Sequence, residues 1–593
     1  MAAAANGAVV PAASATPASV GVAVAKPYSE TQKVDRVKTP KPAWFGCDVF
    51  SPGATCGTVK LPVDYDKPAG AKTEVAVLRL KATDTKRKKL GTLFLNPGGP
   101  GGSGVAIAAA APDFISPAVR ARFDIVGFDP RGTNFSSNVK CWKNLGDQAK
   151  GLKGFDVPFP VTSAEKKQYI ASSESFGRAC STRGVPLSGS MSTAEVARDM
   201  DVLRRMVGDK QLTYLGFSYG TYLGNVYANM FPQRVRAVAI DGVLDPEAWA
   251  GRKWTQSVPQ TQRIKSGEGA SKALNEILKR CKKAGPKYCL LAAEGDPAST
   301  YRGIMSKLKK KPLVERDPDT GEVYFRLTYA VLAGVLLSDM YSPEAAQYVD
   351  ADLYYVATLL AEGGARDAAS VARRDQARAA LAAKIRQAEA TQRRDATTRK
   401  QQAAATGWAF PYDNSPEAFQ AVLCTDGLNP SRARNWSKYA DFANLTAPAF
   451  GPLWTWASAP CASSTWTVRD EDSYRGSFNH ATANPLLVVG SYWDPATNYR
   501  GAVKAASLLP GARLLSSNNW GHTAYGTSAC ATRAVDAYLL QRKLPARGKT
   551  CTGDVQPFTV PLEEQGMQNM RRLAPEPSLP PVVPPLPGAV PRG

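Results

Sequence analysis

The sequence predicts an α/β fold in which helices flank a mostly parallel sheet. Short runs of apolar, β-forming residues recur along the chain, at residues 75–80, 92–96, 123–129, 212–215, 236–241, 485–490 and 512–516. Helical patterns lie between them. An S-x-x-E capping box at 192–195 begins a helix that we expect to end near residue 208, and another helix follows over 221–230. Strands that alternate with helices favour a parallel sheet.

The sheet pattern is interrupted between about residues 248 and 420, where Ala-, Arg-, Lys- and Leu-rich stretches predict a large helical cap. Within the cap, residues 365–405 are polar and arginine-rich, which is typical of a solvent-exposed helix or arm. We therefore expect five segments, namely an N-terminal extension that is an export or pro-segment (1–45), the first part of the core (46–247), the cap (248–420), the second part of the core (421–560) and a proline-rich tail (561–593).

The composition is that of a globular protein. The 593 residues are 44% hydrophobic and 21% charged, which favours neither a disordered nor a membrane-embedded class. No apolar run approaches the ~20 residues that span a bilayer. The net charge of +23 is not accompanied by a nucleic-acid-binding motif. We interpret this charge as a solvated surface, with contact to anionic cell-surface polymers as the alternative, and we expect no nucleic-acid partner.

The ten cysteines indicate disulfides and an extracellular location. They include no C-x-x-C pair, and the chain has two histidines, so we expect no metal site. Our hypothesis is pairing in chain order, 47–56, 141–180, 281–289, 424–461 and 530–551; buried reduced cysteines in a cytosolic enzyme are the alternative. The first 27 residues form a poor signal peptide, although 23–25 have a small-x-small cleavage pattern. We expect a secreted protein, with cell-wall association as a further expectation.

The motif G-x-S-x-G at residues 216–220 lies directly between a predicted strand and a predicted helix. This is the context of a nucleophile elbow, a tight turn that exposes a serine oxygen above a sheet and needs glycine two residues before and two residues after the serine. The sequence therefore predicts that Ser218 is the nucleophile of a serine hydrolase. Because the five-residue pattern also arises by chance, the prediction for Ser218 depends on the predicted strand before the motif and the predicted helix after it.

A nucleophilic serine needs a base and a carboxylate that orients the base. His522 lies in a loop just after a predicted strand, whereas His480 lies between elements and is interpreted as structural. Asp494 also follows a predicted strand, at the carboxyl end where such sites assemble. We predict that His522 is the base and Asp494 its partner; an ordinary turn aspartate before Pro495 is the alternative for Asp494.

The oxyanion formed by serine attack needs N–H donors, one from the residue after the nucleophile and one from a loop after an early strand. The first is Tyr219, and the glycine-rich segment 97–104 is the second. Within it we predict Gly99 as the donor, with Gly98 beside it. A phosphate-binding loop is the rival interpretation, but the segment lacks the lysine of a Walker motif. We expect no cofactor.

The motifs at 97–104, 129–133 (DPRGT), 216–220 and 241–246 (DGVLDP), together with Asp494 and His522, resemble those of secreted bacterial tripeptidyl aminopeptidases, which are relatives of proline iminopeptidases in the α/β-hydrolase superfamily. The resemblance covers about residues 47–551. It implies a helical cap over the site and a peptide substrate cleaved from its free amino terminus. The loop of that family is often His-Gly-Gly-Pro-Gly, and Pro97 stands here in place of the histidine.

An exopeptidase must hold a cationic amino group, so a carboxylate should face the acyl side of the nucleophile. Asp426, in the segment C-T-D-G at 424–427, resembles the C-x-D element of the family, and Glu417 is a second candidate. An ordinary capping or surface carboxylate is the alternative for both. For the whole chain, the alternatives are an esterase or lipase on the same machinery, and a basic cell-wall-associated binding protein without catalytic activity.

Overall fold

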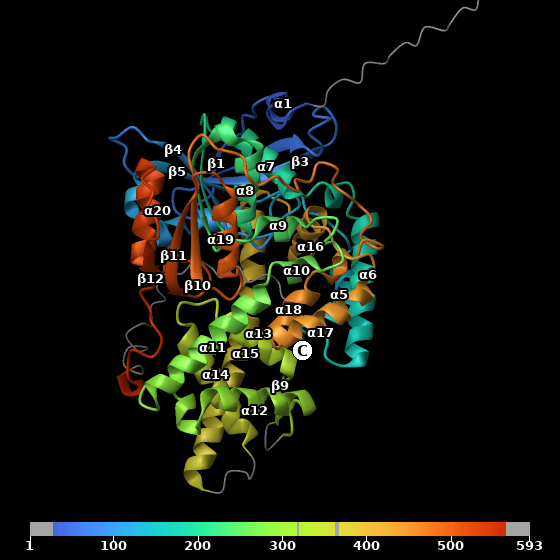
Figure 1. Ribbon diagram of the computed structural model, residues 1–593. Helices are drawn as coiled ribbons and strands as arrows, with labels where there is room; N and C mark the ends of the chain where they lie inside the picture. The colour runs from blue at the N-terminus through green and yellow to red at the C-terminus, as the bar shows by residue number, and fades with distance from the viewer. Residues whose placement is uncertain (1–27, 317–319, 362–366, 565–593) are drawn as a thin grey trace, which may run out of the picture.

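The computed structural model describes residues 28–316, 320–361 and 367–564. The proline-rich segment from 565 onward and residues 1–27 of the predicted extension lie outside the described residues. Figure 1 shows the sheet and its flanking helices at one end of the molecule and the helical cap at the other.

A ten-stranded sheet forms the core, in the order β1-β2-β3-β5-β4-β6-β7-β10-β11-β12. The pairs β1–β2, β2–β3 and β3–β5 are antiparallel. The remaining six pairs, from β5–β4 to β11–β12 in sheet order, are parallel. All seven predicted strands are present. The bounds are β1 Phe45–Gly46, β2 Thr55–Pro62, β3 Lys72–Leu80, β4 Gly91–Asn96, β5 Phe123–Phe128, β6 Leu212–Phe217, β7 Val235–Asp241, β10 Leu487–Trp493, β11 Arg513–Trp520 and β12 Thr550–Thr552.

Helices cover both faces of this sheet, as the alternating pattern predicts. The apolar sides of α7, α8 and α19 join one core cluster, and those of α2 and α20 join the other. Because both faces are covered, every residue of β5 and β6 is buried. The helices of the core are α1 Glu30–Asp35, α2 Gly104–Ala109, α3 Ala111–Phe114, α4 Pro117–Arg120, α5 Leu145–Leu152, α6 Ser163–Thr182, α7 Thr193–Met206, α8 Tyr219–Met230, α19 Tyr499–Leu508 and α20 Ala529–Gln541.

The cap is helical, as expected, and includes one small hairpin. The all-helical region continues past residue 420, because α17 and α18 pack together and α18 packs on α11 before the sheet resumes at β10. No helix within the described ranges combines the length and the apolar character that crossing a bilayer requires. The elements are α9 Pro246–Ala250, α10 Gln260–Arg263, α11 Ser266–Ala284, α12 Pro297–Lys310, β8 Leu313–Arg316, β9 Val323–Leu327, α13 Tyr329–Asp339, α14 Ala345–Leu360, α15 Ala368–Thr406, α16 Ser415–Asp426, α17 Trp436–Thr446 and α18 Phe450–Trp456.

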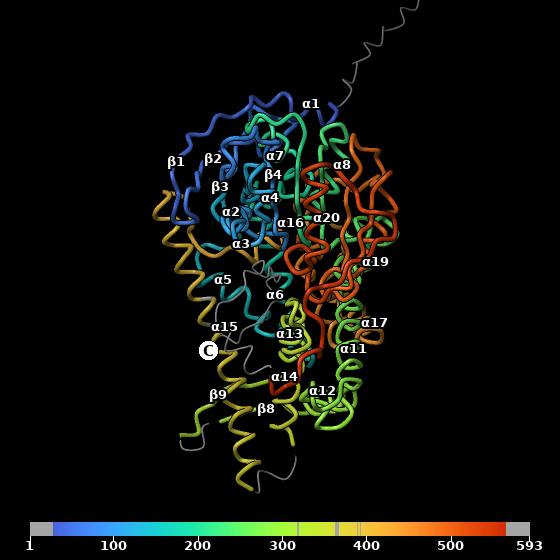
Figure 2. The backbone as a smooth tube through the Cα atoms, turned by 90° about the vertical axis from the view of Figure 1, so that its left-hand side faces the viewer, coloured from blue at the N-terminus to red at the C-terminus, as the bar shows by residue number. Residues whose placement is uncertain are grey.

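The arginine-rich segment forms the 39-residue helix α15, which runs along one side of the molecule from the cap toward β1 and β2 (Figure 2). Lys384 anchors it to the cap, since its ammonium binds the buried carboxylates of Asp339 and Asp352. Just beyond its end, Trp408 packs on Phe135, with ring centroids 5.4 Å apart, and donates a hydrogen bond from Nε1 to Thr58 Oγ1 at 3.0 Å. The segment predicted as a solvent-exposed helix or arm is therefore a largely exposed helix that is tied to both parts of the fold.

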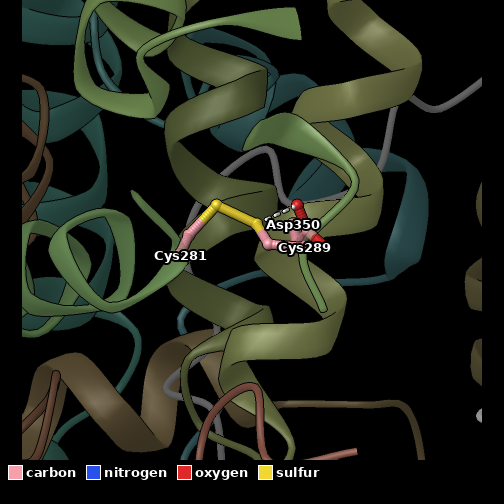
Figure 3. A group of neighbouring side chains, drawn as sticks. All are labelled: Cys281, Cys289 and Asp350. Carbon is pink, nitrogen blue, oxygen red and sulfur yellow. Dashed lines mark hydrogen bonds between the residues drawn. A yellow bond between two sulfur atoms is a disulfide. The ribbon is translucent and has the colours of Figure 1, made fainter. Parts of the chain in front are cut away.

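The five disulfides pair the cysteines in chain order, which confirms the predicted connectivity. Cys281–Cys289 lies at the end of α11 beside Asp350, whose Oδ1 is 2.9 Å from Cys289 Sγ (Figure 3). The Asp350 carboxylate also accepts hydrogen bonds from the N–H groups of Leu290 and Leu291. Because the two sulfurs are bonded to each other, this group offers no thiolate to a metal ion.

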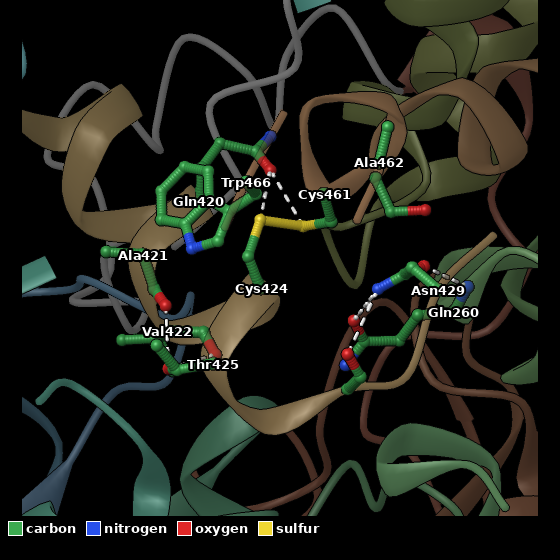
Figure 4. Close-up of a disulfide and its surroundings, with 12 residues drawn as sticks. Gln260, Gln420, Ala421, Val422, Cys424, Thr425, Asn429, Cys461, Ala462 and Trp466 are labelled. Atoms are coloured by element: carbon green, nitrogen blue, oxygen red, sulfur yellow. Dashed lines mark hydrogen bonds between the residues drawn. A yellow bond between two sulfur atoms is a disulfide. The ribbon is translucent and has the colours of Figure 1, made fainter. Parts of the chain in front are cut away.

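The disulfide Cys424–Cys461 joins α16 to the segment that follows α18 (Figure 4). The amide oxygen of Gln420, one turn earlier on α16, faces both sulfurs, and its Nε2 donates a hydrogen bond to Ala457 O at 2.9 Å. This crosslink fixes α16 against the cap. The position of α16 matters because the helix supplies one wall of the candidate site.

A buried ion cluster lies at the amino end of helix α7, which packs on α8 and α1. Arg131, from the D-P-R-G-T segment after β5, is fully buried and binds both carboxylate oxygens of Asp199, at 2.8 and 2.6 Å, and Glu195 Oε2 at 3.0 Å. Its guanidinium also donates to the carbonyl oxygens of Pro62 and Val63. Such a bidentate, fully hydrogen-bonded arrangement is the one in which a buried ion pair is favourable.

Candidate active site

Ser218 occupies the sharp turn between β6 and α8, as predicted. Its backbone has φ 55° and ψ −126°, which an L-residue rarely adopts and which is typical of a nucleophile elbow. A Cβ on Gly216 would lie 2.6 Å from Gly220 O, and one on Gly220 would lie 2.7 Å from Asn96 Oδ1. Both positions therefore require glycine, for the reason that the motif implies.

His522 and Asp494 meet at the carboxyl ends of β11 and β10. His522 Nδ1 lies 3.0 and 2.9 Å from the two carboxylate oxygens of Asp494. The carboxylate is held in turn by Thr497, whose N–H and Oγ1 donate at 2.8 and 2.7 Å. The other ring nitrogen, His522 Nε2, is buried and has no hydrogen-bond partner among the described residues.

His480 lies elsewhere, with Nδ1 2.6 Å from Asn229 O, in agreement with a structural role.

Asp241, the last residue of β7, is a functional candidate that sequence reasoning missed. Its Oδ2 accepts hydrogen bonds from the N–H groups of Ala524 and Tyr525, at 2.9 and 2.8 Å, and its backbone oxygen accepts one from Ser218 N at 3.0 Å. One residue thus ties the loop of His522 to the nucleophile elbow. Burial raises the pKa of the Asp241 carboxyl to about 6. The sequence feature that could have identified Asp241 as a candidate is an acidic residue at the end of a strand of buried residues.

The glycine-rich loop after β4 packs directly on the elbow. Gly98 and Gly99 have φ values of 90° and 109°, which favour glycine. A Cβ on Gly98 would lie 2.8 Å from both Ser218 Cβ and the backbone nitrogen of Tyr219. The loop and the amino end of α8 therefore lie on the same side of Ser218, where backbone N–H donors can face an oxyanion.

Ser218, Gly99 and Tyr219 line one small cavity, and the cap closes it. The cavity measures about 20 Å³, which is room for roughly one water molecule. A peptide is larger, so the cap must shift for a substrate to enter. No charged side chain lines the cavity among the described residues. Most of its wall is apolar and is supplied by Leu244, Trp249, Tyr341, Phe419, Leu423 and Trp454.

Asp426 and Glu417 do not line this cavity. They lie on α16, whose Phe419 and Leu423 do, and both carboxylates are almost fully buried. Asp426 accepts hydrogen bonds from Trp249 Nε1 at 3.0 Å and from the N–H and hydroxyl of Thr193, at 2.7 and 2.6 Å.

Glu417 accepts hydrogen bonds from Tyr412 OH, at 3.0 Å, and from Gln148 Nε2. The hydrogen-bond partners of Asp426 and Glu417 in the described part of the chain are thus all neutral. Burial raises the pKa of Glu417 to about 7 and that of Asp426 to about 6. Buried carboxylates without a cationic partner are frequent at binding sites.

Comparison with known proteins agrees with this geometry. Residues 91–275 match the family model described as alpha/beta hydrolase fold, and residues 447–551 match the model described as TAP-like protein. The tripeptidyl aminopeptidase of Streptomyces lividans is 29% identical over 518 residues, which covers 85% of this chain and 84% of the relative.

Two mycobacterial relatives also match most of the chain. The serine protease Hip1 of Mycobacterium tuberculosis is 31% identical over 538 residues, covering 86% of this chain and 90% of the relative. A protein of the same organism named carboxylesterase B is 30% identical over 529 residues, covering 87% and 91%. The chain is therefore a serine hydrolase of the peptidase type, and it belongs to the family of tripeptidyl aminopeptidases and related serine proteases with the α/β-hydrolase fold.

Proposed function

We propose that the protein is a secreted exopeptidase that releases short peptides, tripeptides in particular, from free amino termini. The observation that carries the proposal is that Ser218, Gly99 and Tyr219 line one cavity walled largely by the cap. Two further residues of its wall contact the proposed catalytic pair, since Thr497 donates a hydrogen bond to Asp494 and the ring of Tyr341 packs on His522. A cavity closed on one side admits only a short segment of chain, which favours removal of a few residues over internal cleavage.

The proposed mechanism is acyl transfer through a covalent intermediate. Ser218 Oγ attacks the carbonyl carbon of the scissile peptide bond while His522 Nε2 takes the hydroxyl proton. The oxyanion that forms accepts hydrogen bonds from the N–H groups of Gly99 and Tyr219. His522 then gives its proton to the leaving amine, and Asp494 orients the imidazole and stabilises its charged form. Water hydrolyses the acyl-enzyme with His522 again acting as the base.

Glu417 and Asp426 are our candidates for the carboxylates that bind the substrate amino group. Both lie behind the wall that α16 contributes to the cavity, and neither forms a hydrogen bond or ion pair with a cationic side chain of the described residues. A substrate ammonium would supply the missing positive charge at a site where a buried carboxylate is otherwise unfavourable. The argument for these two carboxylates is electrostatic. Binding of the ammonium there requires the cap to shift so that the substrate can reach α16.

Replacing Glu417 with glutamine should separate this binding role from a structural one. We expect KM for a tripeptide anilide with a free amino group to rise about tenfold, as loss of a charge-assisted hydrogen bond predicts, while an amino-blocked anilide is affected far less. Asp426→Asn is the matched comparison, because it tests the second candidate on the same helix. Equal effects of Glu417→Gln on free and blocked substrates would contradict the assignment of Glu417.

The same substitution should change how stability depends on pH. Burial raises the pKa of Glu417 from 4.5 to about 7, so the folded state holds its proton more tightly than the unfolded state. The wild-type protein therefore loses stability as the pH rises from 4.5 to 7, by up to roughly 3 kcal/mol. Glutamine does not ionise, so Glu417→Gln should be more stable than the wild type in urea unfolding at pH 8, and the difference should shrink toward pH 5.

The direct test of the proposed specificity compares anilides of two, three and four residues with free and with blocked amino termini. The proposal predicts the highest kcat/KM for the free tripeptide and a large loss on blocking its amino group. Preference for the blocked substrates, or cleavage of internal peptide bonds at a similar rate, would overturn it. These anilides use the same chromogenic leaving group, so differences between them report the acyl side.

An esterase is the second candidate function, and one observation favours it. The cavity beside Ser218 has apolar walls and no charged side chain among the described residues, and such walls suit an acyl chain as well as an apolar residue. The carboxylesterase B named above matches this chain over a similar length. Turnover of short-chain esters with a kcat/KM above that of every free tripeptide anilide would favour this alternative.

Secretion and contact with anionic cell-surface polymers belong to the same proposal. Five disulfides are typical of proteins outside the cytoplasm. The net charge of +23 would attract anionic polymers at low ionic strength. Detection of the protein in the culture medium or in a salt-released wall fraction supports these two points, and recovery in the cytoplasm with reduced cysteines contradicts them.

A further inference from the structure

Two residues that line the active-site cavity carry hydrogen-bond donors with no acceptor among the described residues. The donors are the hydroxyl of Tyr341 and the indole N–H of Trp454, and both residues line the cavity that contains Ser218. Each side chain is 6% exposed. Tyr341 OH and Trp454 Nε1 are fully buried atoms without a hydrogen-bond partner in the described part of the chain.

Tyr341 comes from the turn between α13 and α14, and this turn is fixed against the loop of His522. Its backbone oxygen accepts a hydrogen bond from His522 N at 3.0 Å. Its ring meets the imidazole edge-on, with centroids 5.1 Å apart. A Cβ on Gly521 would lie 2.8 Å from Tyr341 O, so the glycine permits this close approach. The cap therefore places the phenol beside the proposed base.

Both groups are hydrogen-bond donors at the pH where the protein is folded and active, and the neutral phenol can accept a hydrogen bond as well. The indole N–H has no acceptor capacity. Burial, and after it the charge of Asp494, raises the pKa of Tyr341 well above its usual value, so the phenol keeps its proton. Buried donors usually have acceptors. Tyr341 OH and Trp454 Nε1 differ from the other unpartnered buried donors, such as Tyr169 OH and Trp466 Nε1, in belonging to residues that line the active-site cavity, where a bound ligand can supply the acceptors.

The carbonyl oxygens of a peptide backbone are acceptors of the required kind. Once the cap has shifted, the proposed exopeptidase activity requires the space beside Ser218 to hold the short acyl part of the substrate, whereas the remaining polypeptide must extend out of it. An acyl part of a few residues carries several carbonyl groups besides the one that is attacked. A simple acetyl ester carries none besides the reacting one.

We propose that Tyr341 and Trp454 are substrate-binding residues whose hydroxyl and indole N–H donate hydrogen bonds to backbone carbonyl oxygens of the peptide on the acyl side of the scissile bond. This inference rests on the proposed role of Ser218 as nucleophile. It assigns to the cap a part in recognising peptide backbone, in addition to closing the cavity.

Tyr341→Phe tests the hydroxyl with the smallest change of shape, and Trp454→Phe tests the indole N–H. The chain offers matched controls in Tyr169 and Trp466, because Tyr169 OH and Trp466 Nε1 are also buried and unpartnered but neither residue lines the cavity. Each variant is assayed on a free tripeptide anilide and on p-nitrophenyl acetate, and its Tm is measured.

We expect Tyr341→Phe to lower kcat/KM for the tripeptide anilide about tenfold, the range for loss of one hydrogen bond to substrate, and to affect p-nitrophenyl acetate at least fivefold less. Its Tm should not fall, because the hydroxyl has no partner to lose in the free protein. Trp454→Phe should show the same difference between substrates. Tyr169→Phe and Trp466→Phe should show no such difference.

Two results overturn the inference: equal effects of Tyr341→Phe on both substrates, or a tripeptide kcat/KM within twofold of the wild type. Ser218→Ala, assayed in parallel, separates this inference from the proposed function. If Ser218→Ala is inactive while Tyr341→Phe cleaves the tripeptide normally, the proposed function stands and the inference fails. If Ser218→Ala cleaves the tripeptide, the proposed mechanism fails and the inference falls with it.

Discussion

Replacing Ser218 with alanine should lower kcat for a tripeptide anilide by about 10⁴- to 10⁶-fold and leave the fold intact. The loss is large because no acyl-enzyme can form without the nucleophilic oxygen, and the remaining oxyanion donors provide only a small residual rate. The fold should be unaffected because Ser218 is held by its backbone, through its N–H bond to Asp241 O. Steady-state kinetics and thermal unfolding of the purified variant check both points.

Two further variants control this prediction. His522→Ala should lose activity to a similar degree, and Asp494→Asn should lose roughly 10³- to 10⁴-fold because it disturbs the tautomer and orientation of the imidazole. The combination of Ser218→Ala with His522→Ala should be no worse than either change alone, since the two residues act as a unit. Activity of Ser218→Ala within tenfold of the wild type would exclude Ser218 as the nucleophile.

Among the variants considered, Arg131→Ala should lower the free energy of unfolding the most, by about 3–5 kcal/mol. The guanidinium is fully buried and binds the carboxylates of Asp199 and Glu195. Its removal leaves the buried carboxyl groups of Asp199 and Glu195 with fewer hydrogen-bond partners, which costs more than the loss of the hydrogen bonds alone. Equilibrium unfolding in guanidinium chloride measures the difference.

The control for Arg131 is Arg178→Ala, because Arg178 forms an exposed ion pair with Glu174 on α6 at 3.7 Å. That change should cost less than about 1 kcal/mol. A loss below about 1 kcal/mol for Arg131→Ala at pH 7 would show that the cluster contributes little to stability.

The parts of the site that follow from sequence are those carried by local motifs. Gly216 and Gly220 lie where the elbow leaves no room for a side chain, and a five-residue pattern after a strand is enough to predict this. Asp494 and His522 follow buried strands, so the rule that sites assemble at the carboxyl ends of parallel strands places them near each other. The observed Nδ1 contact of 2.9 Å agrees with that expectation.

The parts that could not be predicted depend on contacts between distant segments. Asp241 holds the loop of His522 through N–H groups more than 280 positions away, and a carboxylate at a strand end does not reveal such partners. Tyr341 meets His522 through a turn of the cap, where the sequence has no motif. The polar composition of α15 predicts a solvent-exposed helix or arm, and the helix is largely exposed. The composition does not reveal that Lys384, near the middle of the helix, and Trp408, just beyond its end, dock it on the rest of the fold.

The most direct test of the central claim is the site of reaction with a fluorophosphonate. The active protein is treated until peptidase activity is lost, and the adduct is counted by intact mass and located by peptide mapping. The proposed mechanism predicts one adduct per chain, on Ser218, and none in the Ser218→Ala or His522→Ala variant within the same time. Inactivation through an adduct on another residue, or full activity after stoichiometric labelling of Ser218, would contradict it.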